Sequence, residues 1–195
     1  MWDTFPVEGQ RDLLREHGLH DLFSGQWVQT EDVGDVVRRL GVDPASGVVC
    51  DFPTAMRSYD RYSDEIVVWL GEHAPGWAHM LTLSGTAPPK EVIDTLSAGR
   101  RRVFDVFFIW ETGHLNNRYT YDGVCIGDVS PPYPGGVGEV EEFTPYSRGL
   151  ELGDGMSTAE VFDRILCMVG RITGRFIDRD WFSSPRTLYR LPRKH

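Results

Sequence analysis

The sequence lacks several features that would point directly to a function. It has no uninterrupted apolar stretch of the roughly 18 residues that a helix needs to cross a bilayer, so we expect a protein without membrane association. Only three of its 195 residues are cysteines, namely Cys50, Cys125 and Cys167, and they are widely spaced among apolar neighbours. This pattern is typical of buried, reduced thiols and argues against a disulfide framework.

The pattern of a secretory signal peptide is also missing. Residues 1–18 carry acidic side chains where a signal peptide has a basic region, and no apolar block follows them. Together with the cysteine pattern, this indicates a cytoplasmic protein.

Basic residues are in the minority, because 20 Lys and Arg stand against 29 Asp and Glu, for a formal net charge of -9. Phosphate contacts supply most of the affinity of a sequence-independent nucleic-acid binder and require a basic face, so we expect no nucleic-acid partner. Two short basic clusters, residues 100–102 and 190–194, are interpreted as a strand entry and a terminal tail. An acidic surface instead favours association with a basic protein.

Recognisable catalytic and metal-binding motifs are missing as well. There is no G-x-S-x-G nucleophile elbow, and the glycines at 135–138 are not followed by the Lys-Ser/Thr pair of a phosphate-binding loop. His73 and His79 are close enough in sequence to meet across a turn, but no third metal ligand is indicated nearby. We therefore expect two partly exposed histidines, no metal, no cofactor and no assignable catalytic residue.

The most distinctive stretch that is present runs from Arg100 to Asp128. After Arg102, residues 103–110 are all β-branched or aromatic except Asp105, which is their only polar break. A run that is apolar on both faces is typical of a central strand covered on both sides.

A β-hairpin is predicted shortly after this strand. Residues 118–121 and 124–126 flank Asp122-Gly123, a pair that tolerates the positive φ of a type I′ turn. This turn places Tyr121 opposite Val124 and Tyr119 opposite Ile126. The polar residues 111–117 are expected to connect the central strand to the hairpin.

The rest of the chain predicts an α+β fold, a single domain with a mainly antiparallel central sheet and helices packed on it. We expect a helical N-terminal extension over residues 1–24, and a domain over 25–195 with an irregular Pro/Gly/Glu loop at about 130–156. Ser157 and Glu160 form a capping box that opens the clearest helix. Further strands are expected at 25–29, 65–70 and 77–83, with a terminal edge strand at 187–191, and further helices at 9–17, 30–40, 51–62, 88–98 and 176–181.

Three parts of the sequence together resemble a known family. They are VVRRLG at 36–41, LSAGRRRVFDVFFIW at 96–110 with YTYDG at 119–123, and VGRITGRFIDRDWF from Val169. Their order is similar to that of a family of uncharacterised small α+β domains common in actinobacteria, and the similarity covers about residues 25–192. The resemblance implies a small cytoplasmic domain and brings no catalytic residues with it.

Two groups of residues are candidates for a functional site. Glu111, His114, Asn116 and Arg118 follow the central strand, where an ionisable group held between a rigid element and a loop can serve acid–base chemistry or ligand binding. Ordinary loop polarity is the more frequent explanation of such residues, because connecting loops are polar for backbone reasons alone. The second group lies in the irregular loop and consists of Tyr133, Glu139, Glu141 and Glu142.

Two functions are compatible with these observations. The first is a non-enzymatic protein-binding domain, for example an immunity- or inhibitor-type protein that recognises its partner through aromatic and carboxylate side chains. The alternative is a small-molecule-binding protein or enzyme that uses the polar end of the central strand. The acidic charge and the missing catalytic motifs favour the first.

Overall fold

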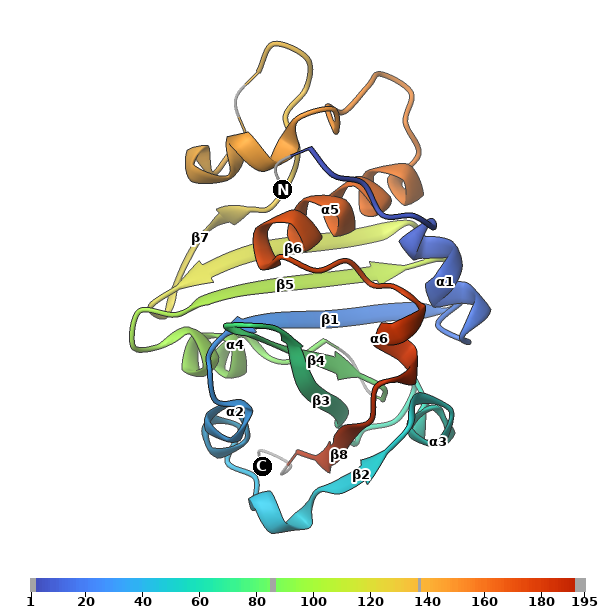
Figure 1. The fold of residues 1–195 in the computed structure, drawn as a ribbon, viewed down its shortest axis with the longest axis vertical. Helices are drawn as coiled ribbons and strands as arrows, with labels where there is room; N and C mark the ends of the chain where they lie inside the picture. The colour runs from blue at the N-terminus through green and yellow to red at the C-terminus, as the bar shows by residue number, and fades with distance from the viewer. Residues whose placement is uncertain (1–2, 85–86, 137, 192–195) are drawn as a thin grey trace.

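The computed structural model describes residues 3–84, 87–136 and 138–191 and shows an α+β fold built on one eight-stranded antiparallel sheet (Figure 1). The strand order is β2-β8-β3-β4-β1-β5-β6-β7. The strands are β1 Leu22–Gln29, β2 Val48–Cys50, β3 Val67–Ala74, β4 Trp77–Thr82, β5 Arg102–Ile109, β6 His114–Tyr121, β7 Val124–Asp128 and β8 Arg186–Arg190. The α+β prediction is confirmed.

The helices lie on both faces of this sheet. They are α1 Gln10–Glu16, α2 Val33–Arg39, α3 Phe52–Ala55, α4 Lys90–Ser97, α5 Thr158–Thr173 and α6 Arg179–Ser183, with 3-10 turns η1 Pro44–Ser46, η2 Met56–Ser58 and η3 Glu141–Ser147. Within the described part of the chain, no helix combines the length and apolar character required to cross a membrane.

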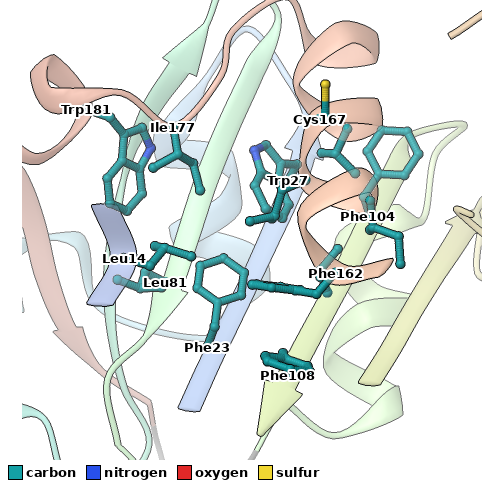
Figure 2. Close-up of a cluster of buried hydrophobic side chains, with 14 of the residues drawn as sticks. Leu14, Phe23, Trp27, Leu81, Phe104, Phe108, Phe162, Cys167, Ile177 and Trp181 are labelled. Atoms are coloured by element: carbon teal, nitrogen blue, oxygen red, sulfur yellow. The ribbon is translucent and has the colours of Figure 1, made fainter. Parts of the chain in front are cut away.

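Side-chain alternation along the strands divides the core into two clusters. Trp27 points into the larger cluster, under α1, α3, α5 and α6, whereas its neighbour Val28 packs in the smaller cluster under α2 and α4. Figure 2 shows the larger cluster, in which aromatic side chains from the sheet meet those of the helices. Both faces of the central strands are therefore covered, as the run at 102–110 predicts.

Helix α5 contributes six buried residues, 162 and 165–169, to the larger cluster and lies along β6 in Figure 1. Its capping box is confirmed: Ser157 Oγ accepts from the Glu160 backbone N–H, and Glu160 Oε2 accepts from the Ser157 N–H at 2.8 Å. The Phe162 ring stacks on Phe108 of β5 with centroids 4.6 Å apart. Burial of a side chain of this size stabilises the fold by about 1.5–3 kcal/mol.

The hairpin prediction is correct at the turn, but the predicted strand register is wrong beyond it. Tyr121 pairs with Val124, as predicted, but Tyr119 pairs with Gly127 instead of Ile126. The register shifts between Tyr119 and Thr120, which inserts an extra residue into β7. Strand β6 also begins earlier than expected, so residues 114–117 pair with β5 and do not form a connection.

The end of the sheet near β8 differs from the prediction too. Strand β8 was expected at an edge, yet it lies between β2 and β3, and the three-residue strand β2 forms the edge. At the N-terminus, Leu13 and Leu14 of α1 are buried in the larger cluster, and β1 already begins at Leu22. The first helix is thus part of the core.

Candidate functional site at the β5–β7 end of the sheet

Strand pairing brings several polar side chains to one face of β5 and β6. Asp105 pairs with Arg118, Phe107 with Asn116 and Val103 with Thr120, so residues at alternate positions share a face. A cavity of about 220 Å³ lies here between α4 and strands β5–β7. Its polar lining comes from Lys90, Asp94, Asp105, Asn116, Arg118 and Thr120.

The base of this cavity is a buried carboxylate. Asp105 is 5% exposed, and its Oδ1 accepts a hydrogen bond of 2.8 Å from Gln26 Nε2 on the neighbouring strand β1. Gln26 is itself fully buried and is further bonded to Ser24 Oγ at 3.2 Å and to Thr82 Oγ1 at 3.4 Å. A polar row thus crosses the sheet, and its members satisfy one another's hydrogen-bonding groups.

The charge state of Asp105 reflects this setting. Burial raises the pKa of the carboxyl, while the Gln26 hydrogen bond and the positive charge of Arg118 act in the opposite direction. Arg118 is exposed, and no ion pair joins it to Asp105 in the described structure. Asp105 therefore has unused capacity to accept a hydrogen bond or a positive charge from a ligand.

The four residues predicted around the end of the central strand separate in the structure. Asn116 and Arg118 line the cavity. Glu111 is exposed in the β5–β6 turn and pairs with Arg61 at 3.2 Å. His114 is exposed at the start of β6, roughly 13 Å along the strand from Arg118, and its ring contacts the edge of Phe107.

The four loop residues also have different surroundings. Glu142 pairs with Arg102 at 2.7 Å, and Glu139 Oε2 accepts from the Asp128 backbone N–H at 3.2 Å, so both hold their segment against the sheet. Tyr133 is 62% exposed, and Glu141 is exposed at the start of η3. Of these four candidates, Tyr133 and Glu141 are therefore the two whose side chains are most open to a partner.

Strand β7 forms one edge of the sheet and presents apolar side chains to solvent. Val124 is 60% exposed and Ile126 is 48% exposed, and in the described structure β7 pairs with β6 alone. Cys125, expected to be buried, is exposed here and also lines the cavity, because it lies on the outermost strand.

Two residues of this site are not identified as functional candidates by their local sequence. Asp105 is only a polar break in an apolar run, and Gln26 lies in a predicted strand without a role. A lone acid in an otherwise apolar central strand was an available signal, since a buried charge needs a polar partner on a neighbouring strand.

Comparison with known proteins identifies no relative: no family model, curated protein or solved structure matches the chain. In the part of the chain that the structure describes, no three His, Cys, Asp or Glu side chains are grouped to hold a metal ion.

Proposed function

We propose that the chain is a cytoplasmic, non-enzymatic protein-binding domain that docks its partner along the open edge of β7. The observation that carries this proposal is the exposure of Val124 and Ile126 on an edge strand. Edge strands are templates for pairing with another chain, and proteins normally cover or charge them. An edge that displays two apolar side chains is suited to strand addition by a partner.

In the described part of the chain, only one end of β7 is covered by a neighbouring side chain. The uncovered part, residues 124–126, is therefore the segment that we assign to docking. Glu139 covers the end of the strand: its carboxylate accepts from Asp128 N–H and lies where a side chain at Gly127 would be. Residues 124–126 have no such cover in the described structure. This leaves room for a short partner strand beside the hairpin turn.

Charge and aromatic content supply the chemistry of recognition. The segment after β7 carries the exposed Tyr133 and Glu141, and the whole chain has a formal charge of -9. Tyrosine is a frequent energetic anchor in interfaces, and opposite charge accelerates docking. A basic partner, as expected for an immunity- or inhibitor-type pair, fits this surface.

The test is affinity capture from native cytoplasm at low salt, with binding then reproduced using the purified partner. The double variant Val124→Lys/Ile126→Lys is expected to lose the partner. Val48→Lys/Val49→Lys is a matched control on the opposite edge strand β2, where both valines are also exposed, and it is expected to retain the partner. Equal binding by both double variants, or no partner at low salt, would refute the proposal.

A second candidate function is the binding of a small ligand in the cavity above Asp105. It is favoured by a buried carboxylate with a raised pKa at the base of a cavity that Asn116 and Arg118 also line. A small amine that donates hydrogen bonds suits this base. Titration with a panel of small amines should stabilise the wild type and fail to stabilise Asp105→Asn; stabilisation of neither protein would remove this candidate.

A further inference from the structure

Asp105 and Arg118 carry opposite charges on neighbouring strands of the sheet. They are direct cross-strand partners in the antiparallel pair β5–β6, so their Cβ atoms lie roughly 4.5–5.5 Å apart on one face. Opposite charges in such positions normally interact. No ion pair joins these two residues in the described structure, so each charge remains open.

The contact with Gln26 explains why Asp105 does not reach Arg118. Gln26 of β1 is the cross-strand partner of Asp105 on its other side, and Gln26 Nε2 donates to Asp105 Oδ1 at 2.8 Å. The carboxyl is thereby held toward β1 and away from β6. Asp105 Oδ2 accepts no hydrogen bond from any described residue, but it is not one of the enclosed polar atoms that lack a partner. It therefore keeps accessible surface in the cavity that Asp105 lines.

Arg118 is the second open charge of this cavity, whose wall includes its side chain. Arg118 is exposed, and within the described residues its guanidinium forms no ion pair or side-chain hydrogen bond. Asp128 of β7 is its cross-strand neighbour on the other side, but no ion pair forms there either. The planar guanidinium fork matches the two oxygens of a carboxylate. Arg118 can thus bind a carboxylate without giving up an existing partner.

The other two charges of the cavity wall neutralise each other. Lys90 Nζ and Asp94 Oδ2 lie 2.5 Å apart, as an i,i+4 pair on α4. Among the charged residues that line the cavity, Asp105 and Arg118 are then left without an ion pair. One open negative group and one open positive group suit a ligand that carries both charges.

We propose that this cavity binds a small amino acid, whose ammonium group donates to Asp105 and whose carboxylate accepts from Arg118. The ammonium contact rests on the proposed binding of an amine above Asp105, whereas the carboxylate contact with Arg118 is new. The cavity volume of about 220 Å³ is below the range of about 300–1,000 Å³ that is typical for drug-sized ligands, so the ligand is small. Ala87, Pro88 and Ile93 form an apolar part of the wall, which suits a short hydrocarbon body.

The competing explanation is that Arg118 is an ordinary solvated side chain and that the cavity recognises an amine alone. The two explanations predict opposite effects of a carboxylate on the ligand. If Arg118 is an anchor, adding a carboxylate to a bound amine strengthens binding. If it is not, the same addition weakens binding, because it brings a negative charge close to Asp105.

The experiment titrates the full chain at neutral pH and constant ionic strength with L-alanine, β-alanine, ethylamine and propionate, following backbone amide chemical shifts by NMR. Removal of the carboxylate from either amino acid leaves ethylamine, and removal of the amine leaves propionate. Saturable binding of at least one of the two amino acids is expected, about tenfold tighter than ethylamine. The comparison of the two isomers measures the spacing of the charges that the cavity prefers.

Variants separate the two contacts. Arg118→Gln should bind ethylamine like the wild type and lose the preference for the amino acid, whereas Arg118→Lys should keep part of it. Asp105→Asn should bind neither ligand, and it also reports any non-specific effect of the probes. Arg57→Gln is the matched control, because it removes the same charge from an exposed arginine outside the cavity wall, and it should bind like the wild type.

Ethylamine binding that equals or exceeds the binding of both amino acids would overturn the assignment of Arg118 and leave the amine site intact. An unchanged preference for the amino acid in Arg118→Gln would overturn it as well, because the carboxylate would then bind elsewhere. Saturable binding of neither the amino acids nor ethylamine would remove the amine site too. Should Asp105→Asn not fold, the comparison of Arg118→Gln with Arg57→Gln still decides.

Discussion

Gln26 and Asp105 face each other across β1 and β5, and Gln26 Nε2 donates to Asp105 Oδ1 at 2.8 Å inside the sheet. This bond determines how the chain tolerates an acid in its central strand. It also leaves Asp105 at the base of a cavity, with a pKa that burial raises.

The first prediction concerns the pH dependence that Asp105 imposes. Because its folded-state pKa is raised, its contribution to stability is fully present below the ordinary carboxyl pKa and is lost as the pH rises through the folded pKa. Asp105→Asn keeps the acceptor for Gln26 and removes this loss, so its stability relative to the wild type should increase with pH. Urea unfolding between pH 3 and pH 7 measures the difference. The exposed Asp64→Asn should track the wild type, and parallel curves for Asp105→Asn would contradict the assignment.

The second prediction concerns acid sensitivity from the buried histidines. The pKa of His73 and that of His79 are depressed, so their stabilisation is present above the ordinary value of about 6.5 and is lost as the pH falls. Each histidine contributes at most about 1.4 kcal/mol per pH unit below that value. His73→Gln/His79→Gln should therefore flatten the stability curve between pH 6.5 and pH 4 in urea titrations. The exposed His114→Gln should leave the slope unchanged.

The third prediction tests the start of α5. Ser157→Ala removes the acceptor for the Glu160 N–H and should reduce the free energy of unfolding by about 1 kcal/mol. Glu160→Gln preserves an acceptor for the Ser157 N–H and should cost clearly less. Chemical denaturation measures both, and a larger loss in Glu160→Gln would show that charge, not capping geometry, is the main contribution.

The fourth prediction tests the path of Arg186 across β3. Gly71→Ala places a methyl group within 2.6 Å of Arg186 Cγ and should destabilise the protein by about 1–3 kcal/mol. In an Arg186→Ala background the same substitution should cost less, because Cγ and Cδ are gone and only the Cβ at 3.1 Å remains. A double-mutant cycle isolates this coupling. Additive losses would mean that the two residues do not compete for this space.

The fifth prediction concerns the cysteines. Cys125 is exposed on β7, whereas Cys167 is buried in α5 and burial raises the pKa of its thiol. A maleimide reagent should therefore modify Cys125 rapidly in the native protein and Cys167 only after unfolding. Mass spectrometry of timed samples identifies the site, and Cys125→Ser should remove the fast phase.

Local sequence signals were sufficient for the elements whose determinants are close in the chain. The Asp122-Gly123 turn and the Ser157–Glu160 capping box each depend on residues within a few positions, and both form as predicted. The register beyond the turn was wrong because the shift next to Tyr119 is stabilised by contacts outside the hairpin, among them Glu139 against Gly127.

Long-range pairing explains what the sequence did not reveal. Strand β2 has three residues, too few for a periodic pattern. Its partner β8 follows more than 130 residues later, at Arg186–Arg190. Gln26 and Asp105 likewise meet only through the alignment of β1 with β5. The buried Arg186 of β8 contacts Trp69 of β3, His79 of β4 and Trp181 of α6, so no single segment indicates these surroundings.

The position of β8 between β2 and β3 has a consequence for biosynthesis. Strands β3, β4, β1, β5, β6 and β7 can pair as the chain emerges, but β3 keeps an open edge until residues 186–190 have been synthesised. Such an edge can pair with other nascent chains. When β8, the strand that carries the buried Arg186, pairs with β3, it covers this edge. Pairing of β8 therefore removes a site at which newly made copies can aggregate.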